Sequence, residues 1–156
     1  MAQKTNAARL LDAAKIPYQL ISYPVDENDL SAVHVAQVLH EDVACVFKTL
    51  VLRGDKSGVF VCVIPGDKEV DLKKAAKAGA NKSCAMVPMK ELLALTGYIR
   101  GGCSPIGMKR TYPTFIDSSC TAHDKIYISA GCRGMQLLID TSALIRFASL
   151  RVADLV

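Results

Sequence analysis

The sequence contains no tryptophan, and aromatic residues make up only 6% of its 156 residues. So few aromatic side chains argue against a stacking platform for single-stranded bases. No apolar run approaches the roughly 18 residues that a membrane span needs. The start of the chain, Met1 to Asn6, lacks the apolar core of a signal peptide. These absences predict a cytosolic protein with no membrane partner.

The six cysteines lack the spacing of a metal site, because no two form a Cys-x-x-Cys pair and no histidine stands at ligand distance from them. Without secretion signals they are expected to be free thiols rather than disulfides. The six are Cys45, Cys62, Cys84, Cys103, Cys120 and Cys132. The sequence therefore predicts neither a metal nor a cofactor.

Hydrolase signatures are missing as well. A serine or cysteine hydrolase needs a nucleophile held by a histidine, but His34, His40 and His123 occupy no recognisable triad setting and the chain has no Gly-x-Ser-x-Gly elbow. Cys103 is the best thiol candidate, because it lies within a glycine-rich segment, yet no basic partner is apparent.

The composition is that of a single globular domain covering residues 1–156, because the chain is long enough to bury a core and 51% of it is apolar. A net charge of +4 is compatible with a polyanionic partner without demanding one. Lys73, Lys74, Lys77 and Lys82 most simply form a solvated face.

Hydrophobic periodicity, turn residues and capping residues predict an α+β chain with a mixed, largely antiparallel sheet. Strands are expected at 18–23, 43–53, 59–64, 83–86, 113–117, 125–129 and 135–139. Helices are expected after Thr5 (to about Lys15), Ser31, Asp71 and Pro88, and after Asp140 or Thr141. Glycine-rich turns at 54–58 and 131–134 predict two hairpins.

Lys48 stands out within the strand expected at 43–53, because it shares one strand face with the apolar residues Val46, Leu50 and Leu52. A lysine there is costly unless its ammonium finds acceptors or water. It is either a binding-site cation or an edge lysine that opposes aggregation.

The segment Gly101-Gly102-Cys103-Ser104-Pro105-Ile106-Gly107 is too rich in glycine and proline for a helix or strand interior. Bare backbone of this kind can approach a ligand closely, although the same residues also suit a simple turn. A cation facing such a wall suggests a pocket for a small anionic or acyl-ester ligand.

Together these motifs resemble the bacterial YbaK family of freestanding aminoacyl-tRNA deacylases, which is similar to the editing domain of bacterial prolyl-tRNA synthetase. The resemblance is carried, in order, by Phe47-Lys48-Thr49-Leu50, Leu72-Lys73-Lys74-Ala75-Ala76-Lys77, Thr96-Gly97-Tyr98, the glycine segment, and Ile126-Tyr127-Ile128-Ser129-Ala130-Gly131 with Arg133-Gly134. It implies a strongly bent, barrel-like mixed sheet of about seven strands with surrounding helices.

The resemblance also implies roles for individual residues. Lys48 becomes the essential lysine, Gly101, Gly102 and Pro105 the pocket loop, and Tyr23 and Ser129 further substrate-binding residues. From the residues alone, Tyr23 equally fits a half-buried aromatic at a strand end. Ser129 also fits a hydroxyl that pairs with the backbone before a turn.

The function implied is removal of cysteine from Cys-tRNA(Pro), and also from Cys-tRNA(Cys), in which the substrate's own thiol attacks the ester. The expected partners are the acceptor end of aminoacylated tRNA and prolyl-tRNA synthetase. Two alternatives stay open: a sibling editor of alanyl- or other small aminoacyl-tRNAs, and a non-catalytic module that binds an aminoacyl end or a nucleotide.

Overall fold

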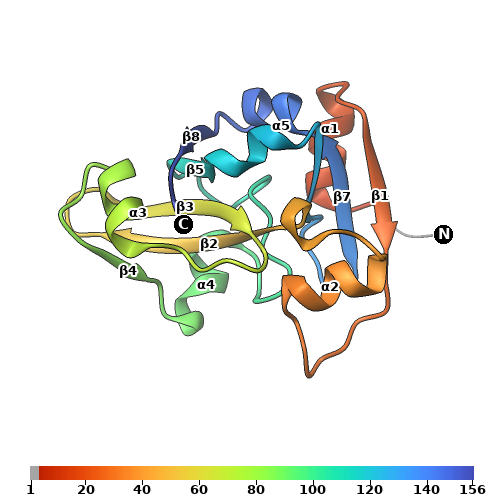
Figure 1. Ribbon diagram of the computed structural model, residues 1–156, viewed down its shortest axis with the longest axis horizontal. Helices are drawn as coiled ribbons and strands as arrows, with labels where there is room; N and C mark the ends of the chain where they lie inside the picture. The colour runs from red at the N-terminus through yellow and green to blue at the C-terminus, as the bar shows by residue number, and fades with distance from the viewer. Residues whose placement is uncertain (1–3) are drawn as a thin grey trace.

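Two β-sheets organise the chain in the computed structural model, which describes residues 4–156 (Figure 1). The three-stranded sheet has the order β1 (Tyr18–Ser22), β7 (Met135–Asp140), β6 (Lys125–Ser129). The five-stranded sheet has the order β4 (Cys84–Met86), β2 (Phe47–Gly54), β3 (Gly58–Pro65), β5 (Thr114–Asp117), β8 (Arg151–Ala153). Met1 to Gln3, part of the segment assessed as a signal peptide, lie outside the described residues.

The expected α+β class and the mixed sheet are confirmed, but the barrel-like sheet of about seven strands is wrong. Eight strands form two sheets, and no closed barrel occurs within residues 4–156. The pairs β3–β5 and β5–β8 are parallel, whereas the other pairs are antiparallel. Among the described residues, the strand pairing between the two sheets is one isolated bridge from Val46 to Tyr127, which is too short to close them into a barrel.

The strand predicted at 43–53 begins later than expected. A 3₁₀ turn, η1 (Val43–Cys45), comes first because the Asp42 carboxylate accepts a hydrogen bond from the Ala44 N–H at 3.0 Å. The Val46 N–H then donates to the Val43 carbonyl. Local side-chain bonding thus competes with the strand, and β2 starts at Phe47.

Within residues 4–156, five helices pack around the sheets: α1 (Asn6–Ala13), α2 (Ala32–Leu39), α3 (Leu72–Ala78), α4 (Met89–Thr96) and α5 (Thr141–Phe147). A further 3₁₀ turn, η2, covers Ser118–Ala122. The expected caps are confirmed at four helices, where Thr5, Ser31, Asp71 and Asp140 accept hydrogen bonds from first-turn N–H groups. α1 ends at Ala13, two residues before the predicted end.

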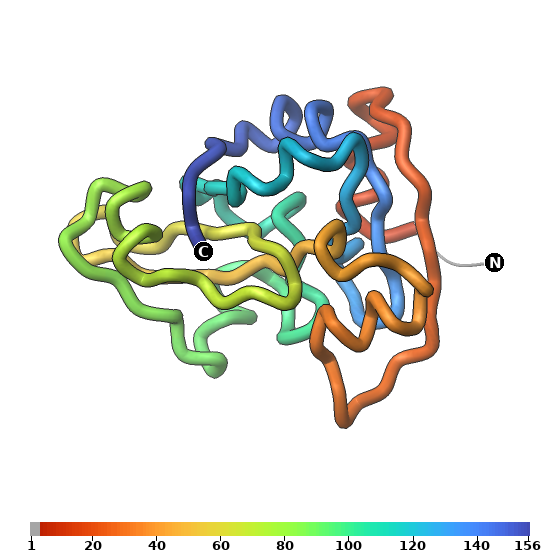
Figure 2. Tube along the Cα trace, in the orientation of Figure 1, coloured from red at the N-terminus to blue at the C-terminus, as the bar shows by residue number. Residues whose placement is uncertain are grey.

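The core is divided between the two sheets. α1 and α5 lie against the three-stranded sheet, where Leu11 and Leu144 join a cluster with Ile126 and Leu137. α3 covers the five-stranded sheet through a second cluster. The end of the chain runs back beside β3 (Figure 2), where the Leu155 carbonyl accepts from the Asp71 N–H at 2.7 Å.

Part of one edge of strand β2 has no neighbouring strand among the described residues. β3 pairs with β2 along its whole length, but β4 reaches only Leu52 to Gly54. Between the Val46–Tyr127 bridge and β4, this edge of β2 therefore has no partner strand among the described residues and is open toward α4 and the 28–32 segment. None of the helices within residues 4–156 has the length and hydropathy to span a bilayer.

Candidate functional site

A cavity of about 590 Å³ lies along the open edge of β2. Its lining comes from the 28–32 segment with α2, from β2, from β4 with α4, from the glycine segment and from β6 and β7. The volume is within the range of about 300–1,000 Å³ that small-molecule sites occupy. Segments far apart in the sequence thus meet at one hollow.

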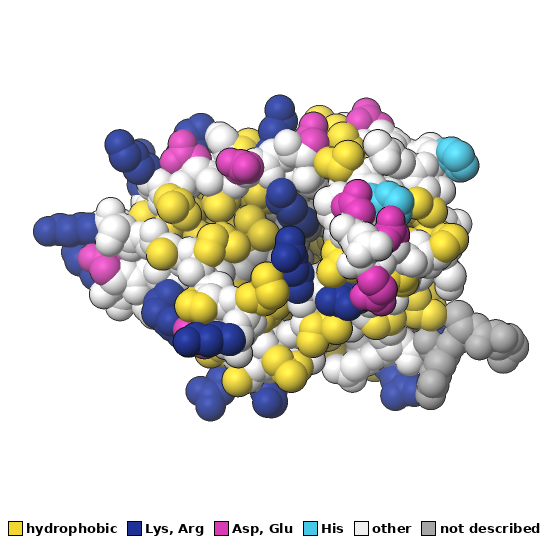
Figure 3. Space-filling view, turned by 90° about the horizontal axis from the view of Figure 1, so that it is seen from below, with side chains coloured by type: hydrophobic (Ala, Val, Ile, Leu, Met, Phe, Trp, Pro, Cys, Tyr) yellow, Lys and Arg dark blue, Asp and Glu magenta, His cyan; other side chains and the backbone are white. Residues whose placement is uncertain are grey.

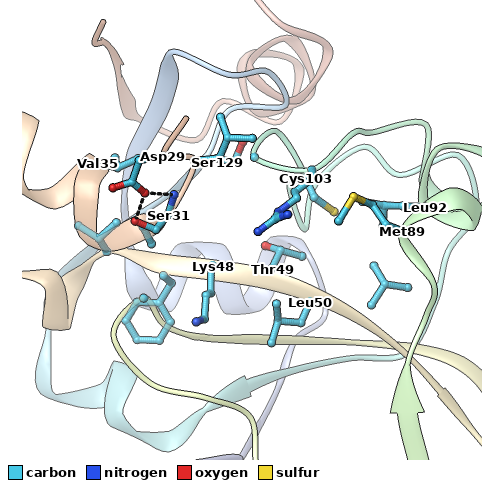
Figure 4. Close-up of a pocket in the computed structure, with 18 of the residues that line it drawn as sticks. Asp29, Ser31, Val35, Lys48, Thr49, Leu50, Met89, Leu92, Cys103 and Ser129 are labelled. Atoms are coloured by element: carbon cyan, nitrogen blue, oxygen red, sulfur yellow. Dashed lines mark hydrogen bonds between the residues drawn. The ribbon is translucent and has the colours of Figure 1, made fainter. Parts of the chain in front are cut away.

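The cavity wraps around the strand edge rather than facing one side of it. All six residues from Val46 to Val51 line it, although successive side chains of a strand point to opposite sides. Figure 4 shows Thr49 directed toward Cys103, whereas Lys48 and Leu50 point to the other side of β2. In this conformation Thr49, not Lys48, faces the glycine segment.

Lys48 is half-buried and lines the cavity. Burial lowers the pKa of its ammonium, and the carboxylates of Glu69 and Asp67 oppose that shift. No carboxylate comes within 4.0 Å of its nitrogen among residues 4–156. The charge is thus available to a ligand, and the flexible stem at an open edge lets it turn toward one.

The glycine segment contributes less of the cavity than expected. Gly101, at φ +84°, lines it. The Gly102 N–H donates to the Ile99 carbonyl at 2.9 Å, so this amide already has a partner. A Cβ at Gly102 would lie 3.0 Å from the Cys132 Cα, which explains this glycine by close packing against the β6–β7 turn. Pro105 lines a separate, smaller cavity.

Of the other two predicted site residues, Ser129 lies at the cavity and Tyr23 does not. Ser129 is 9% exposed and lines the cavity, while its hydroxyl accepts from the Gly131 N–H at 3.2 Å. It therefore pairs with the backbone before the turn and faces the cavity as well. Tyr23 packs with Val46 and Tyr127 in a separate apolar cluster and is not part of the cavity lining.

Two polar residues of the lining were missed by sequence reasoning. The Thr49 hydroxyl and the Gln136 side-chain carbonyl are buried without a hydrogen-bond partner among the described residues. Gln136 lies directly opposite Ser129 in the β6–β7 pairing. Buried polar atoms are normally paired, so two unpaired ones at one cavity indicate a place where a ligand supplies the partners.

The thiol of Cys103 lines the cavity but is poorly suited to attack a substrate. Burial raises its pKa from 9.0 to about 12, whereas reactive cysteines have lowered values. Among residues 4–156, no group of three or more His, Cys, Asp or Glu side chains is placed to hold a metal ion.

Comparison with known proteins identifies the family. Residues 26–147 match the family described as "Aminoacyl-tRNA editing domain". The chain belongs to this family. The matched range includes the whole β2 edge, the glycine segment, Ser129 and Gln136, so the cavity lies within the editing domain, whose substrates are aminoacyl-tRNAs.

A relative from Enterococcus faecalis, named "Putative Cys-tRNA(Pro)/Cys-tRNA(Cys) deacylase EbsC", is 45% identical over 153 residues. The alignment covers 98% of this chain and 93% of the relative. Two solved structures share the editing-domain fold at 22% identity. One, the "hypothetical protein APE2540", has a TM-score of 0.85 over 94% of this chain and 96% of that one. The other, a "putative trans-editing enzyme for prolyl tRNA synthetase", has a TM-score of 0.81 over 98% of both.

Proposed function

We propose that this editing domain is a deacylase that releases cysteine from mischarged Cys-tRNA(Pro), and also from Cys-tRNA(Cys). The observation that carries the proposal is that Lys48, Thr49, Gly101, Ser129 and Gln136 line one cavity, with two of their polar atoms unpaired. The name of the relative from Enterococcus faecalis supports this choice of substrate.

The open edge of β2 suits an aminoacyl ester. The Val87 N–H donates to the Val51 carbonyl, so odd-numbered residues of β2 direct their backbone groups away from β3. By strand alternation, the N–H and hydroxyl of Thr49 both serve the cavity. In our proposal they hold the ester carbonyl, while the Gln136 side-chain carbonyl accepts from the α-amino group and Lys48 lies beside the terminal ribose, where it stabilises the charge that develops on the ester.

The proposed reaction uses the substrate's own nucleophile. The cysteine sulfur attacks the ester carbonyl carbon and the bond to the ribose oxygen breaks. The thiol proton passes to that oxygen, and the products are free tRNA and a cysteine thiolactone that water opens. The protein holds the reacting atoms together, an effect worth roughly 7–11 kcal/mol of barrier. Burial raises the pKa of the Cys103 thiol to about 12, so the proposal assigns the attack to the substrate's thiol and not to this cysteine.

A substrate panel tests this proposal. Cys-, Ala- and Ser-tRNA(Pro) are incubated with the protein, and release of each amino acid is followed. We expect release of cysteine and little release of alanine or serine. Cys-tRNA(Pro) with an S-methylated side chain should be inert. Turnover of the S-methylated substrate would refute thiol attack, and preference for alanine would identify a sibling editor.

We further propose that the domain works in the cytoplasm beside prolyl-tRNA synthetase. A net charge of +4 is modest for recognition of a whole tRNA, so the synthetase would supply that recognition. Adding it to the assay should raise the specificity for tRNA(Pro) over tRNA(Cys). Equal rates with and without the synthetase would remove this partner from the proposal.

A further inference from the structure

Three side chains at the cavity mouth have no role in the proposed chemistry. Met86 on β4 is 46% exposed and Met89 at the start of α4 is 59% exposed, although both line the cavity. Arg100 lines it from the turn before the glycine segment and is also exposed. Figure 3, seen from the side of α4, shows basic side chains crossing the middle of this face between apolar groups.

Arg100 and Arg133, both near this turn, differ in the contacts of their guanidinium groups. Arg133 is tied down at both ends of its guanidinium, by the Arg100 carbonyl at 2.9 Å and by the Glu27 carboxylate at 2.8 Å. Arg100 has its backbone fixed by that first bond. Its own guanidinium has no carboxylate within 4.0 Å among residues 4–156. The fold thus places an unneutralised guanidinium on an anchored backbone at the cavity mouth.

The cavity also has room beyond one small aminoacyl group. Its volume of about 590 Å³ is that of a site for a whole drug-sized ligand. The unpaired polar atoms of Thr49 and Gln136 mark where the aminoacyl group is held. At the mouth of the cavity, the two flexible methionine side chains form an apolar surface. Beside them lies the Arg100 guanidinium, a group that can bind a phosphate.

We infer that Arg100 binds the phosphodiester on the 5′ side of the substrate's terminal adenosine, and that Met86 and Met89 pack against the adenine. The inference rests on the proposed function, because it needs the aminoacyl end in the cavity. A guanidinium fits phosphate through two parallel hydrogen bonds, which a lysine cannot reproduce. Arg100 would therefore select esters carried on RNA over esters of a free nucleoside.

Two uncleavable ligands test this inference by calorimetry. One is adenosine with cysteine joined through a 3′-amide, and the other is the same unit extended by cytidine through a 5′-phosphodiester. The wild-type protein should bind the extended ligand roughly 10-fold to 100-fold more tightly, the range of a charge-assisted hydrogen bond. Arg100→Gln should bring the two affinities within about twofold of each other.

Matched variants separate the site from general charge and from the base. Arg110→Gln removes an exposed arginine that lines the other cavity, and it should keep the full preference. The double variant Met86→Ser/Met89→Ser should weaken both ligands by the same factor. With Arg100→Gln, the salt dependence of binding should also fall by about 0.7 in log–log slope for one phosphate contact.

Equal binding of both ligands by the wild-type protein, or no binding of either, would overturn the inference. The same loss of preference in Arg110→Gln would also overturn it, since that would reflect overall charge. Neither ligand is cleaved, so these results do not depend on catalysis. Failure to deacylate Cys-tRNA(Pro) with an intact ligand preference would instead count against the proposed function alone.

Discussion

The polar groups around strand β2 are hydrogen-bonded at its Gly54 end but remain partly unpaired toward its other end. At the Gly54 end, the side-chain carbonyl oxygen of Asn81 (Oδ1) accepts hydrogen bonds from the backbone N–H groups of Lys56 and Ser57 at 2.9 and 2.8 Å. The Asp55 carboxylate accepts from those of Lys82 and Ser83. Toward the Phe47 end, the edge between β4 and the Val46–Tyr127 bridge has no partner strand, and the Thr49 hydroxyl has no hydrogen-bond partner among the described residues.

Along this one strand, the polar groups that stabilise the fold are therefore different from those available to bind a ligand. Paired polar groups at the hairpin end each contribute to the folded state, whereas an unpaired buried group costs free energy until something binds it. Among the described residues, the buried side-chain oxygens that lack a hydrogen-bond partner both belong to residues of the cavity lining. Substitutions at the two ends should therefore have opposite effects on stability and activity.

Among substitutions of uncharged polar groups, the largest effect should come from Thr49→Val, which removes the unpaired hydroxyl and keeps the shape. We expect kcat/KM for deacylation to fall by roughly 10-fold to 100-fold, because a hydrogen bond to the ester is lost. Stability in urea should be unchanged or slightly higher. The matched control is Thr96→Val, since the Thr96 hydroxyl donates to the Leu92 carbonyl at 2.8 Å and accepts from the Tyr98 N–H at 3.0 Å. Thr96→Val should lower stability, and equal stability losses in both variants would contradict the comparison.

At the other end of β2, Asn81→Ala should lower the free energy of unfolding by about 2 kcal/mol, because several hydrogen bonds to the 54–58 turn are lost. Its kcat/KM at a temperature where the protein stays folded should not change. Chemical denaturation and steady-state kinetics measure the two quantities. A loss of activity with full stability would show that the two ends are not separate.

A smaller effect is expected for Gln136→Leu, which replaces the unpaired carbonyl with an apolar group of similar size. The activity on Cys-tRNA(Pro) should fall by about 10-fold, the loss of roughly one hydrogen bond. Activity on the N-acetylated substrate, which lacks the α-ammonium, should be low and unaffected by the substitution. If the variant loses the same factor on both substrates, Gln136 does not read the amino group.

The smallest effect concerns the pH dependence of stability and should arise from two buried thiols, Cys62 on β3, opposite Leu50, and Cys103 at the cavity. Burial raises the pKa values of Cys62 and Cys103 from 9.0 to about 12. The folded state holds these protons more tightly than the unfolded state, so their stabilisation is complete below pH 9 and is lost as the pH rises toward 12. From about pH 8 to about pH 9.5 the free energy of unfolding should fall by about 1.5 kcal/mol for the two thiols together. Cys62→Ala and Cys103→Ala should each flatten the profile, and an unchanged slope in both would reject this origin.

Local features of the fold could be read from the sequence, because capping and tight turns depend on neighbouring residues. Thr5, Ser31 and Asp71 cap their helices as expected, and the 54–58 hairpin forms. The parallel pairing of β5 with β8 joins distant segments and leaves no local signal. For that reason the short β8 was not anticipated, and the sheets were expected to form a single barrel-like one.

A residue of the cavity lining could be predicted where its type is unusual for its place, as with the lysine at position 48. Thr49 and Gln136 carry no such signal, because a threonine or glutamine in a strand is ordinary until its partners are counted in three dimensions. Gly102 is the opposite case, because its residue type suggested a ligand contact that packing explains instead. Its glycine is required by close packing against Cys132, and that requirement looks the same in sequence as a ligand contact.

The most direct test of the account is the deacylation rate of Cys-tRNA(Pro) with Lys48→Ala, with Lys90→Ala on the exposed side of α4 as the control. We predict a loss of at least roughly 100-fold in kcat/KM for Lys48→Ala, in line with removal of a group that stabilises charge in a site. Its stability and circular dichroism should match those of the wild-type protein, and Lys90→Ala should keep full activity. A rate within about twofold of wild type for Lys48→Ala would contradict the account.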